Sequence, residues 1–263
     1  IVQANMPFAR SYVELLGLGQ RQQSAIDRID ALPDHVDLSP HALYSCGEQV
    51  FHACFQSGRR VSTHLSETLE EIESVRDAHG PLVEHAKKVG SWDESVQPWG
   101  EHPIEAFLKV AGQHTCIAAH LNYLDTNHLP LLASSNITVA YCPRASTYFG
   151  HTNHRWKEMI DAGINVVLGT DSLLCLDTPD RISVIDEMRL LYSRDGGDPL
   201  QLLNMATVHG ATALGFDSSL VTLEKGRIAG LLAFENVRDP LSSIFESSTM
   251  PTWVCPTELA QNA

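Results

Sequence analysis

The chain has 263 residues, 43% of them hydrophobic, which suits one large α/β domain. Its formal net charge of −14 argues against nucleic acid and anionic membranes as partners, because phosphate binding needs clustered Lys and Arg. No apolar run reaches the ~18 residues of a membrane span, and six cysteines without a CxxC pair predict a reduced, cytoplasmic protein.

Short, β-branched apolar runs alternate with helical patterns along most of the chain. Strands are predicted at 9–16, 36–40, 61–64, 115–120, 137–141 and 164–170. Helices are predicted at 47–57, 67–88, 103–112, 126–134, 154–162 and 199–214. The strand runs do not alternate in polarity, as expected for strands covered on both faces.

Helix punctuation supports several of these boundaries. Asp198-Pro199 and Thr178-Pro179 each supply an N-cap followed by a proline, and Gly163 stands just past the end of a predicted helix. Within the predicted helix 67–88, three carboxylates are expected to form a solvated face. They are Glu70, Glu71 and Glu73.

Alternating strands and helices predict a parallel sheet, either open or closed as a barrel. An open sheet would favour a Gly-rich phosphate loop, and neither GxGxxG nor GxxxxGK[ST] occurs. We therefore predict a TIM-like (β/α)8 hydrolase barrel over 1–222 and a small β-sandwich remnant over 223–263, where Leu223–Phe234 is interpreted as a turn entering a buried strand. About six strands are recognisable, which predicts a barrel incomplete at its N-terminus, with an exposed edge that favours a homodimer.

Three predicted strands end in side chains that can bind a metal or move protons. His64 ends the third strand, with Glu67 three residues later, while His120 ends the fourth and Asp171 follows the sixth. Imidazoles and carboxylates at successive strand ends predict a metal-hydrolase site. Each has a structural alternative: a satisfied core histidine, a first-turn helix carboxylate for Glu67, and an N-cap for Asp171 unless Ser172 or Thr178 caps instead.

These residues stand in motifs that resemble the amidohydrolase superfamily, within the branch of nucleoside and nucleobase deaminases and triazine chlorohydrolases. The narrower resemblance is to S-adenosylhomocysteine, guanine and aminofutalosine deaminases. Five motifs run in family order: Ser39–Ser45, His64–Thr68, Ala119–Asn122, Tyr141–Ser146 and Leu168–Ser172. The His-x-His pair of the family's first strand, which supplies two metal ligands, does not occur in the sequence.

The resemblance implies one divalent metal bound by His64 and Asp171, with zinc as the default and iron or manganese as alternatives. Asp171 would also take a proton from the bound water, and Glu67 would relay it to a ring nitrogen and the leaving amine. His120 would hydrogen-bond the attacking oxygen and steady the developing charge.

Three further residues are expected to contact a small heterocyclic substrate: His41, Arg144 and His151. The predicted reaction is hydrolytic deamination of an amino-substituted heterocycle of the purine, pyrimidine or nucleoside type. A chlorohydrolase or amidase using the same metal-bound water is the alternative enzyme. An inactive, metal-poor barrel fragment is the alternative of another class, because His64 and Asp171 are two ligands and catalytic zinc usually has three.

Overall fold

The computed structural model describes residues 8–178, 180–223, 228–235 and 239–254. They form two compact units, each described by itself. The sheet unit consists of residues 11–141 and 149–166. The helical unit consists of residues 8–10, residues 142–148 and the described residues from 167 onward.

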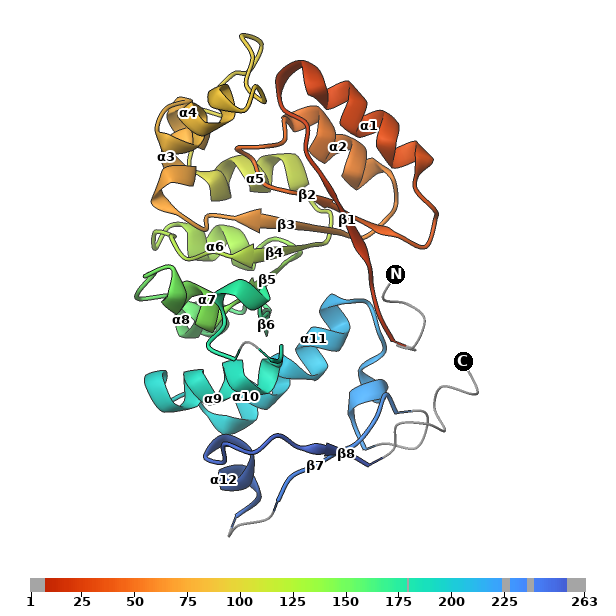
Figure 1. Ribbon diagram of the computed structural model, residues 1–263, viewed down its shortest axis with the longest axis vertical. Coiled ribbons are helices and arrows are strands. Elements are labelled where there is room, and N and C mark those ends of the chain that lie inside the picture. Colours follow the sequence, from red (N-terminus) through yellow and green to blue (C-terminus); the bar gives the residue numbers. More distant parts are fainter. Residues whose placement is uncertain (1–7, 179, 224–227, 236–238, 255–263) are drawn as a thin grey trace. The chain divides into compact units, whose positions relative to one another are not determined.

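Six strands form one sheet in the order in which they occur along the chain (Figure 1). They are β1 (Tyr12–Leu15), β2 (Asp37–Pro40), β3 (Val61–Leu65), β4 (Cys116–His120), β5 (Ile137–Tyr141) and β6 (Val166–Leu168). The neighbouring pairs from β1 to β5 are parallel, and next to them the Val139 amide donates to the Asn165 carbonyl just before β6. All six predicted strands are confirmed. Within the described sheet β1 is an edge strand, and the homodimer stays a prediction.

The strands β3, β4 and β5 alternate between fully buried and half-buried residues. Val61, Ala118 and Val139 belong to the fully buried set. The alternate positions, such as His64, are half-buried. In β3, β4 and β5, therefore, only one face is fully buried, although coverage on both faces was expected.

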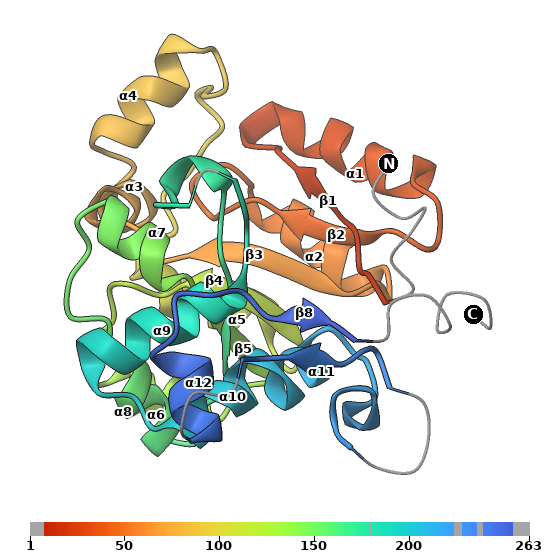
Figure 2. The same cartoon turned by 60° about the horizontal axis from the view of Figure 1, so that its bottom comes forward.

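Helices pack against the sheet within the sheet unit, and α1 and α2 lie side by side (Figure 2). The helices are α1 (Gln22–Ala31), α2 (Glu48–Gln56), α3 (Leu69–Asp77), α4 (Pro81–Lys88), α5 (Pro103–Ala111), α6 (His128–Ala133) and α8 (Trp156–Asp161), with a 3-10 turn η2 (Gly19–Arg21). The predicted helix 67–88 is two helices, because Ala78 (φ 51°) and Gly80 (φ 94°) turn the backbone between them. Pro81 then begins α4 at a position where its missing N–H costs nothing.

The core of the sheet unit contains an aromatic group shared by α2 and α5. Phe51 and Phe107 meet edge to face with ring centroids 6.0 Å apart, and Phe55 packs on Phe107 at 6.3 Å. Such pairs add about 0.5–1.5 kcal/mol beyond the burial of their area. Packing of this kind holds α2 and α5 to each other beside β2 and β3, which they contact.

The helical unit contains α7 (Pro143–Tyr148), η3 (Leu173–Cys175), α9 (Val184–Asp195), α10 (Pro199–Ala206), α11 (Val208–Ala213), η4 (Ser218–Val221), β7 (Leu232–Ala233), α12 (Pro240–Phe245) and β8 (Thr252–Trp253). The predicted helix 199–214 is divided at Thr207, and its predicted cap is confirmed, since the Asp198 carboxylate accepts from the Gln201 amide. The cap at Thr178-Pro179 is wrong: Ser183 caps α9, and Pro179 lies outside the described residues.

The C-terminal region contains the antiparallel pair of β7 and β8. Leu232 and Ala233 of β7 are exposed, so the predicted buried strand is wrong at these positions. Two-residue strands bury too little apolar area to form a core of their own. The boundary between 222 and 223 and the sandwich remnant stay predictions. In the described part of the chain, no helix has the length and apolarity needed to cross a bilayer.

Candidate active site

Four of the predicted functional residues meet at the carboxyl ends of β2, β3 and β4. His41 follows β2, His64 is the penultimate residue of β3, Glu67 follows β3, and His120 ends β4. The His41 and His64 rings have centroids 5.0 Å apart, and the His64 and His120 rings stack at 5.2 Å. Neighbouring parallel strands bring their carboxyl ends to one edge of the sheet. This explains why His41 and His120, 79 positions apart in the sequence, lie in the same group.

One group of possible metal ligands is formed by His64, Glu67 and His120. The Nδ1 atom of His64 lies 3.0 Å from Nε2 of His120, and that same Nε2 lies 3.7 Å from a Glu67 carboxylate oxygen. Each residue offers a donor atom within 4.8 Å of the others. Two neutral imidazoles each have one lone pair, so this arrangement suits either an N–H···N hydrogen bond or a shared cation.

Burial favours the neutral form of His120 and of the neighbouring His41. Burial, followed by the proximity of His64 and then of His151, lowers the pKa of His120 to about 3. Burial and then His64 also lower the pKa of His41. A metal binds the neutral imidazole, so the lowered pKa values keep the lone pairs available near pH 7.

The backbone of β4 explains how His120 comes to face His64. In the sheet register His64 pairs with Ala119, while His120 pairs with Leu65. Regular pleating would thus direct His64 and His120 to opposite faces. His120 has φ 75° and Leu121 has φ 51°, so the alternation ends at His120. Left-handed backbone at a non-glycine residue costs about 1–3 kcal/mol and is concentrated at functional sites.

Hydrogen bonds orient two of the rings around this group. His154 donates from Nε2 to the His120 carbonyl at 2.8 Å. The Ser45 hydroxyl donates to the Ala42 carbonyl at 3.1 Å, so the 2.7 Å contact between His41 and Ser45 is made by the His41 Nδ1–H. That tautomer leaves the lone pair of His41 on Nε2. A second group of possible metal ligands combines His41 and His64 with Glu14 of β1.

His151 belongs to the same unit and pairs with Tyr123. Its Nδ1 lies 2.9 Å from the Tyr123 hydroxyl, and burial lowers its pKa. Its buried Nε2 has no hydrogen-bond partner in the described part of the chain. A buried nitrogen of this kind is available to a bound molecule, which is compatible with the substrate contact predicted for His151.

Asp171 belongs to the helical unit. It is exposed, with φ 58°, and its carboxylate accepts from the Ser172 amide at 2.7 Å. Ser172 caps η3, since its hydroxyl accepts from the Leu174 amide. Of the capping alternatives for this segment, Ser172 is therefore the residue used. The metal-ligand role of Asp171 stays a prediction.

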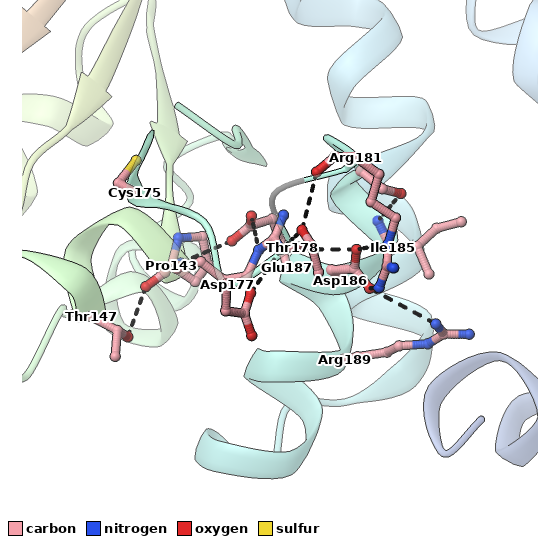
Figure 3. Close-up of polar contacts among 12 residues, drawn as sticks. Pro143, Thr147, Cys175, Asp177, Thr178, Arg181, Ile185, Asp186, Glu187 and Arg189 are labelled. Carbon is pink, nitrogen blue, oxygen red and sulfur yellow. Dashed lines mark hydrogen bonds and ion pairs between the residues drawn. The ribbon is translucent and has the colours of Figure 1, made fainter. Parts of the chain in front are cut away.

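Arg144, at the start of α7 in the helical unit, forms a buried ion pair with Glu187 of α9. Figure 3 shows Glu187 together with Asp177 and Thr178. The Arg144 side chain is 7% exposed, and that of Glu187 is fully buried. The Nε atom donates to Glu187 at 2.6 Å, and Nη1 donates to Asp177 at 3.1 Å and to Thr178 at 2.8 Å. Three side chains of its own unit thus hold the guanidinium in place, and its contact with substrate stays a prediction.

Sequence reasoning missed three residues of this region. Glu14 lies within β1, one residue before its end, and Tyr123 follows the end of β4, so the strand ends were the available signal. Glu71 is fully buried, so its assignment to a solvated helix face is wrong, although Glu70 is exposed as predicted.

The family model described as the amidohydrolase family matches residues 24–254. Among curated proteins, the chain is similar to 5-methylthioadenosine/S-adenosylhomocysteine deaminase of Moorella thermoacetica, with 30% identity over 213 residues, 77% of this chain and 45% of that protein. The chain spans about half the length of the curated relatives it matches.

Two solved structures illustrate the likeness in fold. Aminofutalosine deaminase of Helicobacter pylori has a TM-score of 0.72 at 19% identity, covering 92% of this chain and 65% of that one. A variant of atrazine chlorohydrolase of Arthrobacter aurescens, complexed with zinc and atraton, has a TM-score of 0.69 at 18% identity, with coverages of 92% and 59%. Together with the six-stranded sheet, these matches confirm the predicted fold class.

Proposed function

Because the chain belongs to the amidohydrolase family, we propose that it hydrolyses the amino group of a small heterocycle of the purine, pyrimidine or nucleoside type. The observation that supports this most is the convergence of His64, Glu67 and His120 at adjacent strand ends. The curated relative and the Helicobacter protein are both named as deaminases. The matched family and the donor set therefore favour the same chemistry.

The donor atoms of the site fit a divalent cation. Imidazole nitrogens and carboxylate oxygens are donors that zinc takes, and His120, with a pKa near 3, remains neutral. From the family motifs we propose His64 and Asp171 as ligands, with zinc as the metal and iron or manganese as alternatives. Zinc is present in the matched chlorohydrolase structure. When bound, the ion would act as a Lewis acid that makes water a better nucleophile.

Side chains of this protein would then transfer the protons during the reaction. Glu67 lies beyond the tip of β3 with its carboxylate 3.7 Å from His120 Nε2, so it can hold a proton beside the reacting atoms. We propose that Glu67 passes this proton to a ring nitrogen and then to the leaving amine. His120 would stabilise charge that develops on the attacked carbon's oxygen, while His41 and His151 would contact the heterocycle.

The proposal is tested by screening the full-length protein for released ammonia with purine, pyrimidine and nucleoside substrates after zinc loading. Glu67→Gln should lower kcat by a factor of about 10²–10⁴ while the bound metal, measured by elemental analysis, stays unchanged. Glu73→Gln is the matched control, because Glu73 is bonded to His79 on the surface of α3. Wild-type activity in Glu67→Gln would contradict the role of Glu67.

A second candidate reaction is hydrolytic dechlorination, and the match to atrazine chlorohydrolase is the observation that favours it. It would use the same water activation with a different leaving group. Measuring chloride and ammonia release from paired chloro- and amino-triazines distinguishes the two. Chloride release without ammonia release would overturn the deaminase proposal.

A further inference from the structure

Glu71 is a fully buried carboxylate for which the proposed reaction has no use. Burial raises its pKa to about 7. A buried carboxylate is costly unless hydrogen bonds compensate for the lost water. Two main-chain amides do so here: the Ser66 amide donates to Oε1 at 2.8 Å, and the Glu67 amide donates to Oε2 at 2.7 Å. Both carboxylate oxygens thus bind the two residues that follow β3.

This arrangement differs from the common cap of a helix. Thr68 is the N-cap of α3, and its hydroxyl accepts from the Glu71 amide at 3.1 Å. In a capping box, the glutamate at this position returns to the amide of the cap residue itself. Glu71 also reaches the two amides before the cap. Its side chain therefore ties the segment that carries Glu67 onto the first turn of α3.

The other side of the Glu67 backbone is held by the tip of β4. The Asn122 side-chain amide donates to the Glu67 carbonyl at 3.0 Å. Next to it, the Tyr123 amide donates to the Ser66 carbonyl at 3.2 Å, and the Ser66 hydroxyl donates to the Tyr123 carbonyl. Ser66 itself has φ 51°, a conformation that these bonds maintain.

The N–H of Glu67 is thus fixed by α3, and its carbonyl by the same strand end that carries His120. A general acid–base residue must be held within a fraction of an ångström of its working position, and a displacement of about 1 Å can lower the rate about 10²-fold. These two main-chain anchors restrain the backbone from which the Glu67 side chain extends.

We propose that Glu71, together with Asn122, is a positioning residue that sets the Glu67 carboxylate against His120. This inference rests on the proposed function, in which Glu67 transfers the proton. Glu71 acts through Glu67 and does not touch the substrate. It follows that loss of Glu71 should slow turnover more than it weakens substrate binding.

The test is Glu71→Gln in the zinc-loaded full-length protein, with Glu73→Gln as the control on the same helix. Glutamine keeps the shape of the side chain but turns an NH2 group towards one of the two amides, which removes one of the two bonds. We expect kcat to fall about 10- to 100-fold with KM and zinc content unchanged. Amide hydrogen exchange of Ser66 and Glu67 should accelerate, and Glu73→Gln should match the wild type in every readout.

Should Glu71→Gln fail to fold, Asn122→Ala carries the test with the same expected split between kcat and KM. Unchanged kcat in folded Glu71→Gln would overturn the inference while ammonia release by the wild type upholds the proposed function. A parallel loss of zinc, substrate affinity and kcat would also overturn it, because that result indicates a general structural role. Absence of turnover in the wild type would contradict the proposed function instead. The amide exchange rates would then test only whether Glu71 holds the Ser66 and Glu67 amides.

Discussion

Replacing Arg144 by methionine tests whether the ion pair with Glu187 is as buried as its geometry indicates. The Glu187 carboxylate is fully buried and receives two bonds from Arg144, one from Nε at 2.6 Å and one from the main-chain amide at 2.9 Å. Removing one partner of a buried pair costs about 3–5 kcal/mol. Because the main-chain bond survives in Arg144→Met, we expect the lower end, about 3 kcal/mol of unfolding free energy at pH 7.

The pH dependence of this loss identifies its cause. Burial already raises the pKa of Glu187 despite its bonds to Arg144, and removing the guanidinium should raise that pKa further. A group with a raised folded-state pKa contributes stability that is present below its unfolded pKa and is lost as the pH rises through its folded pKa. The deficit of Arg144→Met relative to the wild type should therefore grow from pH 5 to pH 8.

Urea unfolding followed by far-ultraviolet circular dichroism measures both effects. Arg155→Met is the matched control, because the Arg155–Glu158 pair lies near the surface and such pairs contribute about 0–1 kcal/mol. The double variant Arg144→Met/Glu187→Leu should be less destabilised than Arg144→Met, since no buried charge is left without a partner. A deficit below about 1 kcal/mol, or one that does not change with pH, would refute the reasoning.

Two further substitutions test features remote from the site. Burial and then His128 lower the pKa of His102 to about 4, and its Nδ1 accepts from the Ile104 amide as the N-cap of α5. The imidazole of the unfolded chain is protonated at a higher pH than that of the folded protein, so the wild type loses stability as the pH falls from 6.5 towards 4. Asparagine does not titrate in this range. In urea unfolding, the stability of His102→Asn relative to the wild type should therefore rise by about 1 kcal/mol between pH 7 and pH 5, a value reduced for partial exposure. Ala78 ends α3 with φ 51°, so Ala78→Gly should raise the unfolding free energy by about 0.5–1 kcal/mol, and an unchanged or lower melting temperature would contradict this.

Local pattern was enough to predict the strands and most of the ends of the helices. A run such as Ile137–Tyr141 is apolar and β-branched over the length of a strand, and this property does not depend on distant residues. The helix N-caps were predicted less reliably from the sequence. Asp198 caps its helix as predicted, but Thr178 carries the same signal and binds Arg144 and Arg181 instead. A cap signal states what a side chain can do, and competing partners in the folded chain decide what it does.

The sequence by itself determined which residues could carry the chemistry, because strand ends in a parallel sheet are functional positions and His64, Glu67 and His120 occupy them. Tertiary structure alone decided how they face one another. His120 turns towards His64 through a left-handed backbone that no periodicity predicts. Glu71 is buried against two amides, and Glu187 meets an arginine 43 residues away. A sequence pattern predicts that a charged side chain on a helix faces solvent. Such a side chain can be buried only where hydrogen-bond donors compensate for the lost water, and folding alone brings those donors close.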